Sequence, residues 1–166
     1  MSKEIYLAGG CFWGTEAFMQ RINGVIDAES GYANGNSLNP TYQEVCKGSG
    51  HAEVVKVTYD PAQISLAKLL NYYFQVIDPI SINQQGEDKG IQYRTGIYYV
   101  DPQDSPVITE ALADLQKQYS HPLAVENEML EHYFPAEEYH QDYLDKNPNG
   151  YCHIDLQLMN EILKNQ

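Results

Sequence analysis

The sequence predicts an α/β (α+β) fold: a single domain over residues 1–166 with a mixed β-sheet flanked by helices, a ferredoxin-like two-layer sandwich with a coil-rich C-terminal tail. Segments with strand-like alternation interleave with segments of helical apolar spacing, and each is short enough to need covering by the others. The chain has 166 residues, 43% of them hydrophobic and 11% aromatic, which is enough to fill one core. No internal repeat, low-complexity tract or linker divides it.

The first half of the chain is expected to hold three strands and one helix. Alternating apolar residues predict the strands, Gly9 and Gly10 break the first of them, and apolar residues at helical spacing predict the helix that follows. Cys11 therefore lies where a strand turns into a helix. The expected elements are a strand over Lys3–Ala8, a helix over Phe12–Ile22, a strand near Val25–Tyr32, a polar loop from Asn34 to Pro40 and a strand over Ala52–Tyr59.

The second half is expected to continue this alternation. Ser65 is suited to cap a helix N-terminus, and Pro106 is suited to the first position of another helix. The expected elements are a helix from Ser65 through Phe74, a polar loop over Asn83–Gly90, a strand over Tyr93–Val100, a helix from Ser105-Pro106 to about Tyr119, a strand over Leu123–Met129 and a short helix around Glu137–Asp145.

The charge balance excludes several classes of partner. Ten Lys and Arg against 23 Asp and Glu give a net charge of −13, which repels nucleic acids and acidic membranes. Met1 to Gly10 lacks a basic region followed by an apolar stretch, and no run of about 18 apolar residues occurs. We therefore expect a soluble, cytoplasmic protein with no nucleic-acid or membrane partner, and a monomer by default.

Three cysteines, Cys11, Cys46 and Cys152, are an odd number without Cys-x-x-Cys spacing. This fits neither a secreted disulfide framework nor a zinc ribbon. No metal and no other cofactor is expected, because the histidines form no recognisable ligand spacing with the cysteines. We expect satisfied surface or core histidines at all five positions, which are His51, His121, His132, His140 and His153.

Cys11 is the candidate nucleophile. A thiol attacks as the thiolate, and the free amides and dipole at a helix N-terminus favour that charged form. Gly9 and Gly10 allow a tight turn, while Phe12 and Trp13 place two aromatic rings beside the sulfur in a narrow apolar pocket. The alternative is a buried core cysteine without chemistry.

The residues around Cys11 resemble a known signature. Gly-Cys-Phe-Trp-Gly-Thr-Glu, residues 10–16, is similar to the signature of the A-type peptide methionine sulfoxide reductases. The resemblance spans nearly the whole chain, through Asn-Pro-Thr-Tyr-Gln-Glu-Val-Cys at residues 39–46, Gly-His-Ala-Glu-Val-Val at 50–55, Asp-Lys-Gly-Ile-Gln-Tyr-Arg at 88–94 and Asn-Pro-Asn-Gly-Tyr-Cys at 147–152. It implies a thioredoxin-dependent enzyme that repairs the S epimer of methionine sulfoxide, free or in proteins.

The chemistry of sulfoxide reduction requires an acid, because the sulfoxide oxygen leaves poorly as an anion. Glu53 precedes an apolar run, where desolvation would keep its carboxyl neutral, so we expect it to be the proton donor. The resemblance implies that Tyr42 and Tyr93 hydrogen-bond the sulfoxide oxygen and that Asp88 supports this network. Phe12 and Trp13 would hold the substrate methyl group. Packing or solvation is the alternative for each of these four side chains and for Asp88.

Turnover requires a second thiol to condense with the Cys11 sulfenic acid. The resemblance implies that Cys152, in the tail over residues 147–166, is this resolving cysteine, and that Cys46 is an accessory or structural thiol. No further cysteine follows Cys152, so a two-thiol relay that ends at thioredoxin is expected.

Two rival functions stay open at this stage. A cysteine hydrolase would pair Cys11 with a histidine such as His51, although no peptidase signature surrounds Cys11. A redox sensor or peptide-binding module would oxidise at Cys11 and bind methionine without turnover. Consumption of dithiothreitol with methionine sulfoxide would separate both from a reductase.

Overall fold

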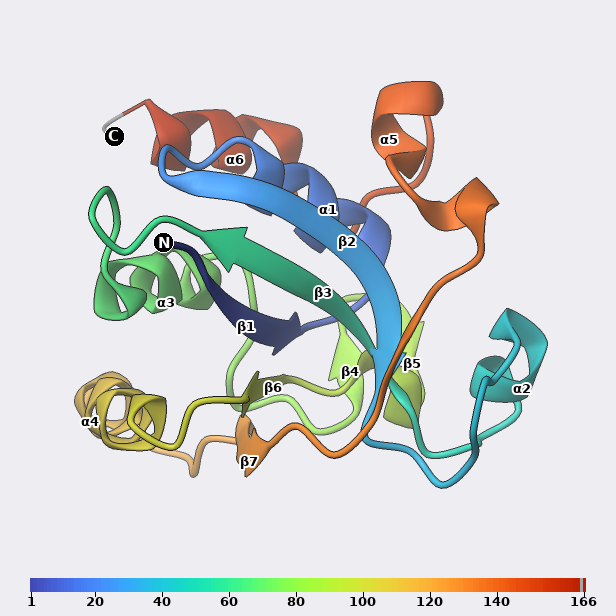
Figure 1. Ribbon diagram of the computed structural model, residues 1–166, viewed down its shortest axis with the longest axis horizontal. Coiled ribbons are helices and arrows are strands. Elements are labelled where there is room, and N and C mark those ends of the chain that lie inside the picture. Colours follow the sequence, from blue (N-terminus) through green and yellow to red (C-terminus); the bar gives the residue numbers. More distant parts are fainter. Residues whose placement is uncertain (165) are drawn as a thin grey trace.

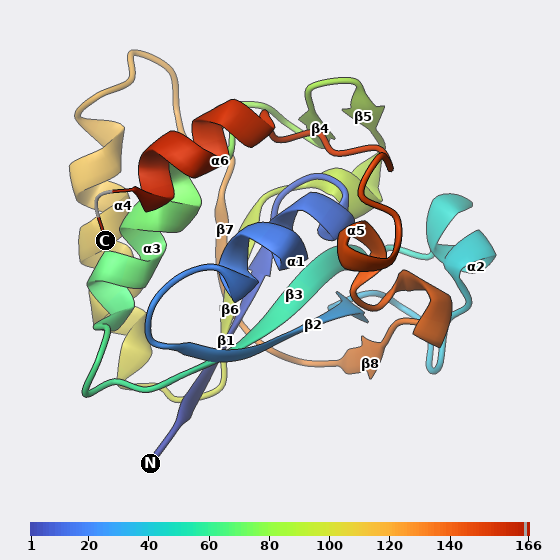
Figure 2. The same ribbon diagram turned by 90° about the horizontal axis from the view of Figure 1, so that it is seen from above.

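The computed structural model describes residues 1–164 and 166. Its main sheet has six strands in the order β7-β6-β1-β3-β2-β8 (Figures 1 and 2). All neighbouring strands are antiparallel except β6 and β7, which run parallel, so the sheet is mixed, as predicted. The strands are β1 (Lys3–Ala8), β2 (Val25–Ala33), β3 (Ala52–Tyr59), β6 (Gly96–Tyr99), β7 (Glu126–Met129) and β8 (Tyr133–Pro135).

Helices cover one face of this sheet. Figure 2 shows α1 (Phe12–Gln20), α3 (Leu66–Phe74) and α6 (Leu156–Leu163) on the same side, and α4 (Asp104–Gln116) packs against α3. The order β1-α1-β2-β3-α3-β6, with the central strands arranged as β6-β1-β3-β2, is the ferredoxin-like arrangement. The predicted fold class is therefore confirmed.

Alternation along the central strands builds the core beneath these helices. Ile5 and Leu7 of β1 face Val57 and Val55 of β3, and Leu7 also faces Ile97 of β6. All five side chains are completely buried. Because successive strand residues point to opposite faces, this register commits one face of the sheet to the helices.

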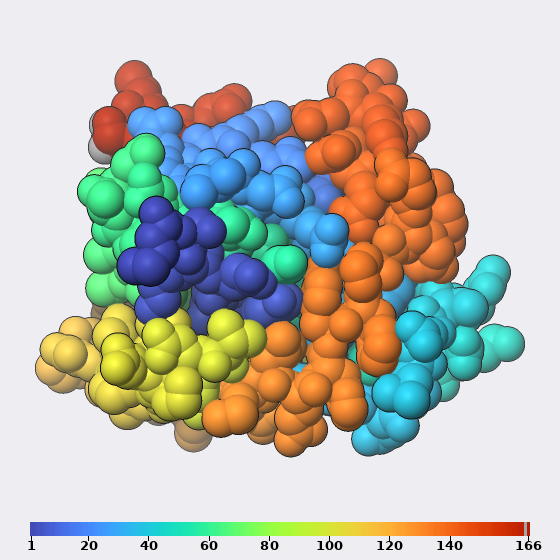
Figure 3. All heavy atoms as spheres, viewed as in Figure 1, coloured from blue at the N-terminus to red at the C-terminus, as the bar shows by residue number. Residues whose placement is uncertain are grey.

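The segment from the end of β7 through β8, which includes Leu130, covers the opposite face. Tyr6, Val54 and Tyr98 are buried there, with Leu130 and Tyr133 packed against them. Figure 3 shows this orange segment lying across the sheet, and β8 within it pairs with β2. The same segment then turns to the end of the sheet where Cys11 lies.

Several predicted boundaries were wrong for local reasons. The strand predicted over Tyr93–Val100 forms only from Gly96 to Tyr99, because a 3-10 helix, η1 (Ile91–Tyr93), follows Gly90 at φ 142°. The helix predicted to begin at Pro106 begins at Asp104 and ends at Gln116. Pro106 fits there because the amides of the first turn have no partner within the helix.

The last predicted strand and helix are shorter than expected. The strand predicted over Leu123–Met129 begins only at Glu126. The helix around Glu137–Asp145 is divided into a 3-10 helix, η2 (Glu138–His140), and α5 (Tyr143–Lys146). Between them Asp142 adopts a left-handed conformation at φ 53°, and its amide donates to Glu16 at 2.8 Å. A tertiary hydrogen bond therefore interrupts the helix.

Some elements were not predicted at all. The tail is coil from residue 147 to 155, as expected, but α6 replaces the coil expected beyond it. The other unpredicted elements are short: α2 (Tyr42–Cys46), β8, and the hairpin of β4 (Gln84–Gln85) with β5 (Asp88–Lys89).

Within the described residues, no helix is both long and apolar enough to span a membrane.

Candidate active site

Two carboxyl groups converge on the N-terminus of α1, where Cys11 is the N-cap residue. The Cys11 amide donates to Asp88 Oδ2 at 3.3 Å, and the Phe12 amide donates to Glu53 Oε1 at 3.2 Å. The first amides of a helix have no partner within the helix, so carboxyl oxygens from β3 and β5 satisfy them here. The structure thereby brings the predicted Cys11, Glu53 and Asp88 together.

Glu53 is almost entirely removed from water, with 1% of its surface exposed. Burial raises the pKa of its carboxyl to about 8; the charge of Asp88 adds to this rise, and the Phe12 amide opposes it. At neutral pH this carboxyl is therefore mostly protonated. Its second oxygen, Oε2, is buried without a hydrogen-bond partner, so it is available to a bound molecule.

The thiol of Cys11 differs from the sequence prediction. Burial raises its pKa far above the ordinary value, the nearby Glu53 and Asp88 carboxyls raise it further, and the Trp13 amide opposes them only in part. The direction of this pKa shift is opposite to the one that the sequence predicts. The helix N-terminus does favour negative charge, but two carboxyl groups already occupy it and Cys11 is only 8% exposed.

An aromatic recess surrounds this thiol. The buried Phe12 ring lies 5.7 Å from that of Tyr32 and 5.1 Å from that of His140, measured between centroids. Trp13 stacks on Tyr143 at 3.7 Å with an interplanar angle of 8°, and its Nε1 donates to His140 Nδ1 at 3.0 Å. The indole and phenyl rings are thus fixed in orientation, as a recess for a small apolar group requires.

Tyr42 and Tyr93 reach the same region from α2 and η1. Burial raises the pKa of both phenols, and Glu53 is the next cause in each case, which places both hydroxyls near its carboxyl. Both phenols therefore stay protonated and can donate. The backbone of Tyr42 is held by its amide, which donates to Glu137 Oε2 at 3.0 Å, and its ring contacts that of His140 at 4.5 Å.

Cys152 lies against the first turn of α1. A Cβ atom at Gly14 would come within 2.9 Å of Cys152 Sγ, so the absence of a side chain there makes room for the sulfur. The preceding residue, Tyr151, donates from its hydroxyl to Asp88 Oδ1 at 2.9 Å. Figure 2 shows the segment between α5 and α6 passing beside β5, which carries Asp88. All three cysteines are free, and Cys46 is exposed at the end of α2.

His51 does not serve as a partner for Cys11. Its Nδ1 accepts from the Gly35 amide at 3.1 Å, and its Nε2 lies 2.8 Å from the Ser37 carbonyl oxygen. Both ring nitrogens are therefore engaged within one loop. His51, the histidine named for the hydrolase alternative, is therefore not available as a base for Cys11.

Sequence reasoning missed two histidines at this site. His140 and His153 were expected to be satisfied surface or core residues, yet both have buried ring nitrogens without a hydrogen-bond partner. The only available signal was the position of His153 next to Cys152 in the chain. His140 is brought to Trp13 by a contact that spans 127 residues, which a single sequence does not reveal.

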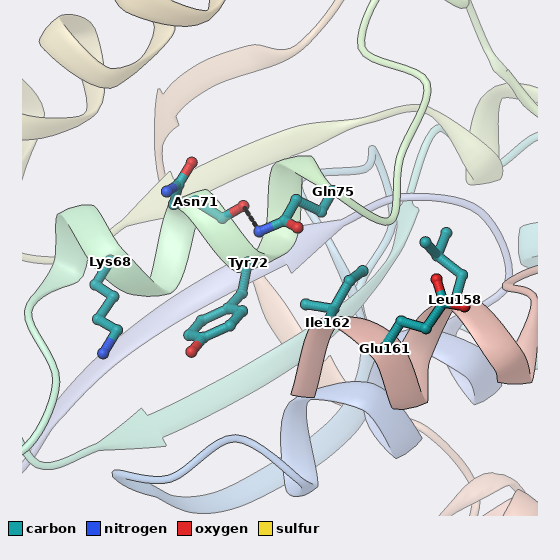
Figure 4. Close-up of a pocket in the computed structure, with 7 residues that line it drawn as sticks. All are labelled: Lys68, Asn71, Tyr72, Gln75, Leu158, Glu161 and Ile162. Carbon is teal, nitrogen blue, oxygen red and sulfur yellow. Dashed lines mark hydrogen bonds between the residues drawn. The ribbon is translucent and has the colours of Figure 1, made fainter. Parts of the chain in front are cut away.

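A separate cavity of about 470 Å³ lies between α3 and α6 (Figure 4). Lys68, Tyr72 and Glu161 are among the residues that line it, and none of its lining residues is one of the site residues described above. Within residues 1–164 and 166, no group of three or more His, Cys, Asp or Glu side chains is arranged to hold a metal ion.

Comparison with known proteins agrees with this geometry. The family model for peptide methionine sulfoxide reductase matches residues 3–166. A peptide methionine sulfoxide reductase MsrA of Lachnoclostridium phytofermentans is 56% identical over 155 residues, which cover 93% of each chain.

Two solved structures have the same fold. Mxr1 from Saccharomyces cerevisiae in reduced form superimposes with a TM-score of 0.89 at 37% identity, covering 93% of this chain and 92% of that one. Methionine sulfoxide reductase A of Corynebacterium diphtheriae superimposes with a TM-score of 0.82 at 34% identity, covering 91% and 77%. The chain therefore belongs to the peptide methionine sulfoxide reductase family, in its A type.

Proposed function

We propose that the chain reduces the S epimer of methionine sulfoxide with Cys11 as nucleophile and Glu53 as proton donor. The observation that carries this proposal is the position of Cys11 as the N-cap of α1, next to the Phe12 amide that holds the buried carboxyl of Glu53. A protonated carboxyl with one free oxygen beside a thiol suits a reaction in which an oxygen must gain a proton as sulfur attacks.

The first step is an oxygen transfer that balances without a cofactor. The Cys11 sulfur attacks the sulfoxide sulfur while Glu53 protonates the oxygen, and the proton lost from the thiol restores the Glu53 carboxyl. In the resulting adduct the hydroxyl passes to the Cys11 sulfur as the sulfoxide S–O bond and the new S–S bond break. The products are a methionine sulfide and a Cys11 sulfenic acid, so two electrons pass from the cysteine sulfur to the methionine sulfur. Because burial raises the pKa of the Cys11 thiol, the thiol gives up its proton to the Glu53 carboxylate once Glu53 has protonated the substrate oxygen.

The surrounding side chains have separate roles in this step. Phe12 and Trp13 hold the substrate methyl group in the aromatic recess. Tyr42 and Tyr93, both protonated, donate to the oxygen as charge develops on it. Asp88 positions the Cys11 amide and acts through its hydrogen bonds.

The second step regenerates the thiol through Cys152. Its thiol condenses with the sulfenic acid to give a disulfide and water, and a thioredoxin dithiol then reduces that disulfide. Two observations support this assignment: Cys152 packs on the first turn of α1, and Mxr1 from Saccharomyces cerevisiae has been solved in complex with Trx2. Cys46 is the accessory thiol of this proposal, and residues 147–166 form the tail that carries the resolving cysteine of one catalytic domain.

The proposed setting follows from this redox chemistry. A reaction that ends with free thiols and thioredoxin is suited to the reducing cytoplasm, and we assign the protein there as a monomer. Fractionation followed by detection of the chain tests the first assignment, and sedimentation equilibrium tests the second. A periplasmic or dimeric protein would contradict it.

Mass spectrometry after one equivalent of a methyl sulfoxide substrate tests the mechanism. We expect an intramolecular Cys11–Cys152 disulfide in the wild type, a Cys11 sulfenic acid in Cys152→Ser, and no sulfide product with Cys11→Ser. Sulfoxide reduction by Cys11→Ser at the normal rate would overturn the proposal. Turnover without dithiothreitol consumption would instead indicate a hydrolase, and binding without turnover would indicate a sensor.

A further inference from the structure

The imidazole of His153 occupies a narrow space beside the N-terminus of α1. Its side chain is 4% exposed. A Cβ atom at Gly10 would lie 2.7 Å from Nε2, and one at Gly14 would lie 3.2 Å from Nδ1. These glycines flank Cys11 on both sides along the chain. The ring therefore fills space that only glycine at both positions leaves open.

Cys152 shares that space. A Cβ atom built at Gly14 would lie 2.9 Å from Cys152 Sγ and 3.2 Å from His153 Nδ1. The sulfur and the ring nitrogen are therefore both next to the same point on the surface of α1. His153 is also the residue that follows Cys152 in the chain.

Both ring nitrogens of His153 are buried without a hydrogen bond of normal geometry, although the Gly9 backbone lies near the ring. A buried polar atom without a partner costs free energy, and such atoms are found where they serve a reaction. The nearest carboxylate oxygen, Asp88 Oδ2, lies 3.9 Å from Nδ1, which is too far for a hydrogen bond to the neutral ring but close enough to stabilise its cation. The Gly9 backbone faces the ring as well.

We propose that His153 accepts the proton of Cys152 when this thiol attacks the Cys11 sulfenic acid, an inference that rests on the proposed function. The Cys152 S–H bond breaks, its proton passes to the imidazole, and the thiolate forms a bond to the Cys11 sulfur. The Cys11 S–O bond breaks at the same time. The leaving hydroxide takes the proton back from the imidazolium and departs as water, so no oxidant or reductant beyond the two sulfurs is needed.

The charges around the pair support this direction of proton transfer. Burial lowers the pKa of His153, with Asp88 and the Gly9 backbone opposing it, so the ring is neutral and able to accept a proton. Burial raises the pKa of Cys152, although the positive charge of Arg21 opposes this, so the thiol needs a base at neutral pH. The other ionisable groups at this point are the Cys11 thiol and the Tyr151 hydroxyl, which holds the far oxygen of Asp88.

Single-turnover kinetics separates the two chemical steps. Wild type, His153→Gln and, as a control, His121→Gln with its exposed imidazole are mixed with one equivalent of dimethyl sulfoxide or a methyl sulfoxide peptide. Acid-quenched samples are assayed for sulfide and for the Cys11–Cys152 disulfide. We expect His153→Gln to release the full burst of sulfide but to form the disulfide on the order of 100-fold more slowly, with accumulated sulfenic acid. Disulfide formation at the rate of the control would overturn the inference.

The pH profile and chemical rescue distinguish a base from a structural support. The wild-type rate of disulfide formation should be flat around neutral pH, whereas the rate of His153→Ala should keep rising as the Cys152 thiol ionises and should approach the wild type at alkaline pH. Added imidazole should restore at least part of the lost rate in His153→Ala. A profile that is lowered in parallel at every pH, without imidazole rescue, would overturn the inference.

Cys152→Ser separates failure of this inference from failure of the proposed function. If Cys152→Ser still forms a disulfide with Cys11 at the wild-type rate, Cys46 is the resolving thiol, and both the relay and the role of His153 are wrong. If Cys152→Ser traps the sulfenic acid while His153→Gln behaves as wild type, the relay stands and only the role of His153 is wrong.

Discussion

The two cysteines of the proposed relay are held in opposite ways. Cys11 lies between β1 and α1, and its partner Glu53 belongs to β3, which is paired on both sides within the sheet. Cys152 lies in coil and is fixed by a few contacts, among them the hydrogen bond from Tyr151 to Asp88. The difference indicates that oxygen transfer needs a fixed geometry, whereas the second thiol must move toward Cys11 and then present a disulfide to a reductant.

The largest effect is expected at the fixed side of the site, which comprises Cys11 and its partner Glu53. Glu53→Gln removes the proton donor but keeps the shape of the side chain, so sulfide release in a single turnover should fall by about 100- to 10,000-fold. Because the pKa of Glu53 is about 8, the wild-type rate should also decline as the pH rises above that value. Glu110→Gln on the exposed surface of α4 is the control. Wild-type sulfide release by Glu53→Gln would remove Glu53 from the mechanism.

The Glu53→Gln substitution, which should lower activity, should raise the free energy of unfolding as the pH rises. The folded protein raises the pKa of Glu53 from 4.5 to about 8, so between these values it binds a proton that the unfolded chain has released. The contribution of Glu53 to stability is therefore present at low pH and is lost as the pH rises through this window. Glu53→Gln should thus gain stability relative to wild type with rising pH, on the order of 5 kcal/mol at most.

Urea unfolding between about pH 5 and pH 9 measures this difference, with Glu110→Gln again as the control. Glu16, whose pKa burial raises to about 7, has the same effect in both proteins and cancels in the comparison. A constant difference between Glu53→Gln and wild type across this range would show that Glu53 is charged in the folded protein. The site would then lack the protonated carboxyl that we infer at neutral pH.

Sequence patterns predicted the long strands and helices better than the short elements that connect them. Alternation placed β1 and β3 at their observed ends, and Ser65 caps α3 by accepting from the Lys68 amide at 3.1 Å. The missed β4, β5 and β8 are two or three residues long, which is too short for any periodicity. For α6 a signal was present, since Asp155 caps it by accepting from the Gln157 amide at 2.8 Å and apolar residues follow at helical spacing.

The site shows the same division. Cys11, Phe12 and Trp13 are contiguous in the chain, so local reasoning could find them. Glu53 could be proposed from the apolar run that follows it, but Tyr42, Tyr93 and Asp88 were distinguished from similar residues only by resemblance. The pKa of Cys11 depends first on burial and then on two carboxyl groups brought from distant strands, which the local pattern does not contain.

Gly14→Ala tests the mobile side of the site, which is the coil that carries Cys152 and His153, without removing a polar group. The added methyl would approach Cys152 Sγ and His153 Nδ1 at 2.9 and 3.2 Å, so the coil must move away from α1. We expect disulfide formation to slow by about tenfold, the order of change that a small misplacement of reacting groups produces. Alanine also stabilises a helix interior by roughly 1 kcal/mol relative to glycine, so thermal stability should hold. Rapid quench with thermal unfolding measures both, and a wild-type rate would show that the observed packing of Cys152 is irrelevant to the relay.

Tyr151→Phe should have the smallest effect, because it removes one hydrogen bond from the mobile side. Asp88 keeps the Cys11 amide as a donor when the Tyr151 hydroxyl is lost. An exposed hydrogen bond of this kind contributes about 0.5–1 kcal/mol, so disulfide formation should slow by roughly two- to fivefold. Tyr119→Phe, in the loop that follows α4 and outside the site, is the control. If sulfide release slows as much as disulfide formation, Asp88 transmits the change to Cys11, and the fixed and mobile sides are coupled through that single carboxylate.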